Sequence, residues 1–392
     1  MQSHSAAASI AKVREIARDI LPAEARNADR ENRLPIKSIE ALQAAGLFGF
    51  SASETQGEAK CDMRMFSKVA QIIGEQCLAT AFIWVQHIQQ LALLVEHGNE
   101  SASVVIQDVA RNGSLLASIT TEEKKGGELL HAYSSLSEDR PGYSRVRRIA
   151  PMVAYGEKAT WFLVTMRASS EASLNCVNLV AVHRDDPGEI AVTGDWESMG
   201  MVGTRSVPML LDVVVPNRRI LHGFKEIAIQ SMIPFAHVGW SSMWFGAARG
   251  AYERFVAETR KNRSVFASDL FTHRLARIRL LLDTVSYALG AVISDLEAIR
   301  AGGDAGGYSN PGFNIKLNNL KILAAESCYE AIERLVELAG LFRGYLAQEY
   351  LQLERVFRDL RSASLMLNND RLLEANGKMI MLEGTALMKS LI

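Results

Sequence analysis

The fold of this chain is decided by the stretch QLERVFRDLRSASLMLNND, which runs from Gln352 to Asp370. Apolar residues recur in it at the spacing of one helix face, at Leu353, Val356, Phe357, Leu360 and Ala363. Arg358 and Asp359 lie in the same short run. Two interpretations are open: an amphipathic helix with solvated charges, which is the commoner case, or a helix whose Arg-Asp pair leads the chain to an active site.

Composition limits the class of protein. The 392 residues are 48% hydrophobic and 22% charged, which is typical of a globular chain with two or three domains. The net charge of -1 gives no reason to expect nucleic acid or an anionic membrane as a partner. We find no uncharged apolar segment typical of a secretory signal and no apolar run near the length of a membrane span.

The cysteines and histidines give no indication of a disulfide framework or a metal site. Four cysteines are scattered without a CxxC pair, at Cys61, Cys77, Cys176 and Cys328. Isolated thiols of this kind are typical of a reduced, cytoplasmic protein and not of a disulfide framework or a zinc site. The eight histidines show no metal-ligand spacing, so we expect no bound metal. We therefore expect a cytoplasmic location.

The character of the sequence changes twice along the chain. Residues 1–112 read as helices, 113–226 contain short β-branched segments such as WFLVTMR and PMLLDVVVP, and 227–392 return to a helical period. This order predicts a mainly α fold with a central β domain. We expect an N-terminal helical domain (1–112), a middle antiparallel β-barrel (113–226) and a C-terminal four-helix bundle (227–392).

Three further stretches carry a family resemblance. They are ADRENRLPIKSIEALQAAGLFGF (28–50), DWESMGMVGTRSVPMLLDVVVPNRRIL (195–221) and GAARGAYERFVAETRKNRSVF (246–266). In this order and at these distances, they and the Arg-Asp stretch resemble the acyl-CoA dehydrogenase superfamily. The resemblance implies FAD as the cofactor and a homo-oligomer, either a dimer or a tetramer.

The resemblance also implies cofactor contacts. The family's flavin loop corresponds here to TEEKKGGE, which keeps Thr121 and Glu122, and the positions beside the isoalloxazine ring hold Met152 and Ala154.

A second set of family positions reaches the FAD of a neighbouring subunit. By the resemblance, this set comprises Arg263 and Phe266, then Leu270 and Arg274, and finally Glu337 and Gly340. Glu337 stands where the family has Gln, so it brings negative charge towards the pyrophosphate.

The sequence leaves more than one candidate for the catalytic base. The family's usual Glu follows the Arg of Arg-Asp by nine residues, and Leu367 stands there. Glu383, in MLEGTALMKSLI, is one candidate base, but it requires a 16-residue insertion that loops out with a turn at Asn376–Gly377.

Two histidines are the other candidates. His87 lies on the helix ATAFIWVQHIQQ, and His237 lies near the place where a minority of the family carries its Glu. For each of them a core or interface histidine is the commoner alternative.

Three hypotheses of function follow from the resemblance. The first is an FAD-dependent oxidoreductase that acts on an acyl thioester of CoA or a carrier protein, with α-proton abstraction and hydride transfer to flavin N5. The second is a two-component monooxygenase that uses reduced flavin and oxygen. The third is a non-catalytic family member. Expected partners are a flavin reductase or an electron-transfer flavoprotein, with no nucleic acid and no membrane.

Overall fold

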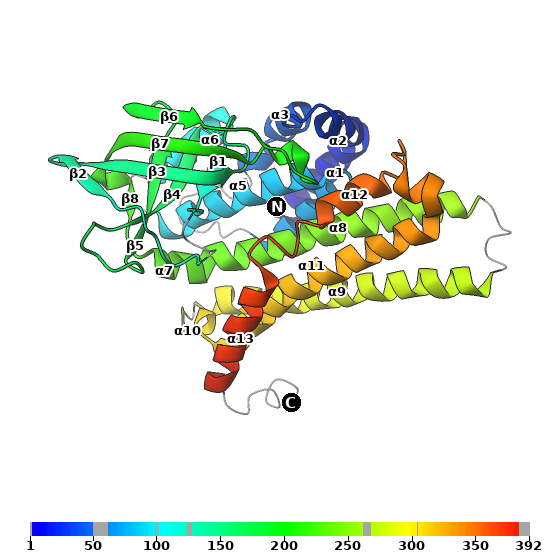
Figure 1. Cartoon of the computed structure of the whole chain (residues 1–392). Helices are drawn as coiled ribbons and strands as arrows, with labels where there is room; N and C mark the ends of the chain where they lie inside the picture. Colours follow the sequence, from blue (N-terminus) through cyan, green and yellow to red (C-terminus); the bar gives the residue numbers. More distant parts are fainter. Residues whose placement is uncertain are drawn as a thin grey trace.

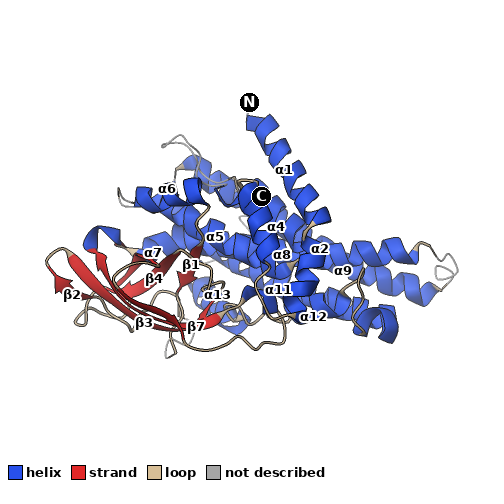
Figure 2. Cartoon of the chain, turned by 90° about the horizontal axis from the view of Figure 1, so that it is seen from above, coloured by secondary structure: helices blue, strands red, loops and turns tan. Residues whose placement is uncertain are grey.

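The computed structural model describes residues 2–49, 62–98, 100, 102–123, 128–261, 268–303 and 305–383. Helices come first, strands follow and long helices end the chain, as Figure 1 shows. This confirms the predicted mainly helical fold with β structure in the middle. The strands gather on one side of the helical part, which is clear in the view from above (Figure 2).

The N-terminal part is a set of six helices built around α5. Their bounds are α1 Gln2–Asp19, α2 Leu21–Arg30, α3 Ile36–Ala44, α4 Met63–Gly74, α5 Leu78–His97 and α6 Ala102–Asn112, with a short 3₁₀ turn η1 at Leu47–Gly49. Asp62 begins α4 by accepting hydrogen bonds from the backbone N–H groups of Arg64 and Met65. By length and composition α5 could cross a membrane, which we had not expected of any segment, but 83% of its apolar window is buried inside the protein. It is a core helix.

The middle part contains two four-stranded sheets. The strands are β1 Leu116–Ile119, β2 Ser137–Arg140, β3 Tyr143–Val153, β4 Trp161–Arg167, β5 Val177–His183, β6 Gly188–Val192, β7 Val207–Pro216 and β8 Ile220–Leu221, in the orders β1-β4-β5-β8 and β2-β3-β7-β6. The expectation of an antiparallel barrel needs two corrections, because β1 pairs with β4 in parallel and the strands do not form one closed sheet. Strand β4 is buried on both faces, whereas β7 alternates buried and half-buried residues. The first sheet is therefore the inner one, and it packs against α5 and α6.

The C-terminal part is dominated by three long helices. Its elements are α7 Phe224–Ile227, the π-helix η4 Ala228–Met232, α8 Ile233–Thr259, α9 Asp269–Gly302, α10 Ala305–Tyr308, α11 Pro311–Gly340, the π-helix η6 Leu341–Tyr345, α12 Leu353–Leu360 and α13 Asn369–Glu383. α11 packs against both α8 and α9, and α13 lies against α11. The short helix α10 lies in the connection between α9 and α11.

The stretch from Gln352 to Asp370 forms a junction between these parts. Its helix α12 ends at Leu360, and the chain then makes a series of turns to reach α13. Gly200, in the loop before β7, packs directly on α12, because a Cβ there would lie 2.1 Å from the carbonyl oxygen of Arg358. The close approach requires a glycine at this position.

Candidate functional site

A cavity of about 790 Å³ lies where α5, the strands and α8 meet the segment after α12. This volume falls within the range of about 300–1,000 Å³ that is usual for small-molecule and cofactor sites. One wall comes from the loop before β7, through Met201, Thr204 and Ser206. The opposite wall comes from residues 362–368, which follow α12.

Several residues expected from the sequence line this cavity together. Thr121, Met152, Ala154 and His237 all contribute to its surface, and so does Leu367. The Thr121 hydroxyl donates a hydrogen bond to the Met152 carbonyl, at 3.2 Å. The structure thus gathers residues that are more than a hundred positions apart in the sequence.

Glu122, which together with Thr121 matches the family's flavin loop, also lines the cavity. Its carboxylate accepts hydrogen bonds from the backbone N–H groups of Tyr133 (2.9 Å) and Ser134 (2.8 Å), and it forms an ion pair with the buried side chain of Arg148. Burial raises the pKa of Glu122, but these donors and the guanidinium together hold it below its usual range. Glu122 is therefore a bound carboxylate and not a free base.

His237 is completely buried and lines the cavity. Its Nδ1 lies 3.3 Å from the carbonyl oxygen of Leu317, which can only accept a hydrogen bond, so Nδ1 carries the proton. Burial and the nearby ammonium of Lys321 lower the pKa of His237 to about 3, so the ring is neutral. Its Nε2 consequently carries a lone pair, and within the described part of the chain this atom has no hydrogen-bond partner.

His87 lies outside the cavity, and we do not retain it as a catalytic candidate. Its Nε2 is 2.8 Å from the carbonyl oxygen of Phe48, and its Nδ1 accepts the backbone N–H of Leu116 at 3.1 Å. Burial lowers the pKa of His87 to about 4. Because both ring nitrogens form hydrogen bonds with backbone groups, this histidine joins the N-terminal helices to β1.

Leu367 occupies the cavity side of the turn before α13, in the left-handed region at φ 47°. Its carbonyl oxygen accepts a hydrogen bond from the Lys321 ammonium at 2.9 Å, and the same ammonium donates to Asn369 at 2.7 Å. Burial lowers the pKa of Lys321 to about 8. The backbone of Leu367, which by the resemblance stands at the position of the family's usual base, is therefore fixed.

Glu383 lies at the other end of α13. It is 14 residues beyond Asn369, which at 1.5 Å per residue is about 21 Å along the helix axis. The expected turn at Asn376–Gly377 is wrong, since α13 is continuous there and Asn376 exchanges side-chain hydrogen bonds with Asn318 (2.8 Å) and Asn319 (2.9 Å). We therefore no longer consider Glu383 the base.

The second set of predicted cofactor residues lies far from the cavity. Leu270 and Arg274 are exposed at the start of α9, and Glu337 and Gly340 are exposed at the end of α11. Figure 1 shows these two helix ends together at the end of the bundle remote from the strands. Arg263 and Phe266 lie outside the described residues.

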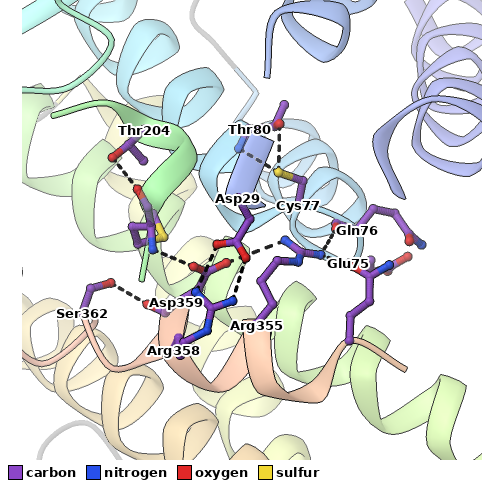
Figure 3. Close-up of polar contacts among 12 residues, drawn as sticks. Asp29, Glu75, Gln76, Cys77, Thr80, Thr204, Arg355, Arg358, Asp359 and Ser362 are labelled. Atoms are coloured by element: carbon purple, nitrogen blue, oxygen red, sulfur yellow. Dashed lines mark hydrogen bonds and ion pairs between the residues drawn. The ribbon is translucent and has the colours of Figure 1, made fainter. Parts of the chain in front are cut away.

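Arg358 and Asp359 hold α12 in place (Figure 3): the apolar face of the helix is buried as predicted, but Asp359 is buried too and is not a solvated charge. Arg358 pairs with Asp29 of α2 at 2.7 Å, and the buried Asp359 accepts the backbone N–H of Met201 at 2.6 Å. Burial raises the pKa of Asp359 to about 6. These contacts fix α12, and hence the wall that follows it, to the opposite wall at Met201.

Comparison with known proteins identifies the family. Residues 4–103 match the model of the acyl-CoA dehydrogenase N-terminal domain, and residues 238–368 match that of the C-terminal domain. The chain belongs to the acyl-CoA dehydrogenase family. It is accordingly a flavin oxidoreductase, and a flavin is the cofactor typical of the family.

Three relatives show how broad the family is. A probable acyl-CoA dehydrogenase, fadE25 of Mycobacterium leprae, is 22% identical over 90% of this chain and 88% of its own length. The amino sugar nitrososynthase DnmZ of Streptomyces peucetius is 22% identical over 88% of this chain and 86% of its own. The structure of FMN-bound TdsC from Paenibacillus sp. A11-2 shares the fold with a TM-score of 0.82 at 17% identity, covering 95% of this chain and 96% of that one.

Proposed function

We propose that this enzyme is a two-component flavin-dependent monooxygenase, which takes reduced flavin from a separate reductase and uses oxygen. The observation that carries the proposal is that none of the described carboxylates at the cavity is placed to act as a free, positioned base. Leu367 occupies the usual base position, and Glu122 is bound by Arg148 and two backbone donors. The remaining lining carboxylate in the described residues, Glu123, is exposed to solvent. α-Proton abstraction from a thioester needs a positioned base, whereas activation of oxygen by a reduced flavin does not.

The cavity suits a flavin ring. Thr121, Thr204 and Ser206 offer hydroxyl groups to the polar edge of the ring, and Met152 and Trp196 offer polarisable faces to its plane. When bound in its reduced form, the flavin supplies the electrons that activate oxygen. The chain's own contribution is to hold the ring, to orient the substrate and to exclude water.

His237 orients the substrate in this proposal. Its unprotonated Nε2 is buried without a partner among the described residues, and a buried acceptor of this kind is costly until it receives a hydrogen bond. A substrate with a hydroxyl or amine N–H satisfies it, whereas the carbonyl of a thioester cannot. The name of the relative DnmZ, an amino sugar nitrososynthase, is in keeping with a substrate that carries such groups.

A homo-oligomer completes the site in the proposal. A flavin in the cavity cannot reach Arg274 or Glu337 of the same chain, because these residues lie at the remote end of the bundle. We therefore propose a dimer or tetramer in which these positions of a neighbouring subunit contact the distal part of FAD. FMN, which lacks that part, is the alternative cofactor, and comparing the affinities for FAD and FMN distinguishes the two.

A second candidate function is acyl-thioester dehydrogenation with His237 as the base. It is favoured by the place of His237 on α8, near the family's less common base position, and by the sequence relation to fadE25. A ring with a pKa of about 3 is a weak base for this task. In this reading, the electron acceptor is an electron-transfer flavoprotein.

The monooxygenase and the dehydrogenase are distinguished by whether they require oxygen and an external reductant. Under anaerobic conditions, we expect oxidised flavin on the protein to remain oxidised with a panel of acyl thioesters. With a reductase, reduced flavin and oxygen, substrates that carry a hydroxyl or an amine should yield oxygenated product. Bleaching of the flavin by a thioester, without oxygenated product, refutes the monooxygenase; a protein that binds no flavin refutes both enzymes.

A pair of histidine variants tests the orienting role. His237→Phe should raise the KM for substrate or lower product formation by at least about tenfold, which corresponds to about 1.4 kcal/mol, and leave flavin affinity unchanged. His222→Phe, at an exposed position between β8 and α7, is the matched control and should change neither quantity. Equal effects of the two variants would contradict the assignment.

A further inference from the structure

A second hollow lies away from the cavity and shares no lining residue with it. This groove, of about 680 Å³, is bounded by α1, α2, the end of α4, α8 and the segment Glu349–Gln352. We call it the arginine groove, because its lining includes Arg14, Arg18, Arg26 and Arg254. None of the residues assigned above to the flavin or the substrate belongs to it.

The carboxylates at the groove are already neutralised. Glu349 pairs with Arg26 at 2.9 Å, and Glu75 pairs with Arg249, which stands outside the lining. Arg18 pairs with its neighbour Asp19 at 2.7 Å. Among the described residues Arg14 and Arg254 form no ion pair, so the groove carries an excess of positive charge.

Arg254 is the more informative of these two residues. One of its terminal nitrogens donates to the backbone carbonyl of Glu75 at 2.8 Å, while its Nε is buried and has no partner within the described chain. Burial and the neighbouring guanidinium of Arg355 lower the pKa of Arg254 to about 10. Arg355 is itself buried, and its carboxylate neighbour Asp359 is 3.7 Å away. Two adjacent guanidinium groups thus share little negative charge, a costly arrangement that an anion would relieve.

The rest of the lining is suited to an organic body attached to that anion. Ile72, Ala17 and Pro22 supply apolar surface, and Tyr350 has a side chain that is 55% exposed and free to cover a planar ring. Guanidinium groups bind phosphate oxygens in a two-pronged geometry, which favours phosphate over a single-point anion.

We propose that the arginine groove binds a phosphorylated small molecule, with its phosphate on Arg14 and Arg254 and a planar ring on Tyr350. A nucleoside monophosphate has this chemistry. The site is separate from the flavin cavity, so the proposal stands independently of the monooxygenase assignment.

Calorimetric titration of the full protein with two probes, AMP and inorganic phosphate, tests the proposal. We expect both to bind, AMP more tightly. Arg14→Ala should weaken both probes by at least about tenfold, equal to about 1.4 kcal/mol, whereas Tyr350→Ala should weaken AMP alone. Arg14 is exposed on α1, so its variant should fold normally.

Lys12→Ala is the matched control. It removes a positive charge from the same helix, but Lys12 pairs with Glu15 at 3.1 Å and does not line the groove. It should leave both affinities unchanged. The proposal is overturned if the native protein binds neither probe, or if Arg14→Ala and Lys12→Ala bind AMP equally, because AMP then binds elsewhere or responds only to overall charge.

Discussion

Replacement of Asp359 by asparagine should stabilise the protein more at high pH than at low pH. Burial raises the pKa of this carboxyl from 3.8 to about 6, so the folded state holds a proton that the unfolded state has lost. The stability that this proton gives is complete below about pH 4 and is lost as the pH rises through 6. At 1.36 kcal/mol per pH unit, the ionised carboxylate costs the folded state about 3 kcal/mol above pH 7. Asparagine does not ionise and keeps an oxygen that can accept the Met201 N–H.

The assay is urea unfolding of the native protein and the Asp359→Asn variant at pH 5 and pH 8. We expect the free energy of unfolding of the variant, relative to that of the native protein, to rise by about 1.4 kcal/mol between these two pH values. Glu354→Gln, a change of the same kind in the first turn of α12, is the control for a general effect of charge. If Asp359→Asn is destabilised to the same extent at both pH values, the carboxylate is an ionised partner of the neighbouring arginines and the reasoning fails.

Three further variants test other parts of the structure. Gly200→Ala should destabilise the fold by about 1–3 kcal/mol in urea unfolding, since its Cβ would meet the backbone of Arg358 at 2.1 Å; an unchanged midpoint would show that α12 can move. His87→Gln should cost about 1–3 kcal/mol by leaving a buried backbone group without its partner, while flavin affinity measured by fluorescence stays the same; loss of flavin at normal stability would restore His87 as a site residue. Arg148→Met should cost about 3–5 kcal/mol in thermal or urea unfolding, and adding Glu122→Gln should recover part of it; no recovery would show that the two side chains act separately.

The order of elements was readable from the sequence because periodicity is a local property. The segment WFLVTMR coincides with β4, and the helical period predicted beyond residue 227 corresponds to the long helices α8, α9 and α11. Strand β3 was not predicted because Arg148 is buried and Ile149 beside it is exposed, which breaks the apolar alternation of the strand. The parallel pairing of β1 with β4 could not be predicted either, since a single sequence does not say which strands become neighbours.

Only part of the candidate site could be predicted from the sequence. The resemblance placed Thr121, Met152 and Ala154 in one region, and the structure brings them to one cavity. Periodicity could not distinguish His87, both of whose ring nitrogens bond to backbone groups, from His237, which lines the cavity. A Gly at position 377 suggested a turn, but the side-chain contacts of its neighbour with α11 hold that part of α13 in place.

The backbone at Leu367 is held by a hydrogen bond from Lys321 and not by the leucine side chain. Lys321 reaches across from α11 to bind the carbonyl of Leu367 and the side chain of Asn369, so the turn keeps its shape whatever group residue 367 presents to the cavity. The backbone conformation at position 367 therefore does not depend on the leucine side chain, and we expect Leu367→Glu to fold with the same turn. A change in the reaction catalysed could then arise by a single substitution, without a new fold having to evolve around it.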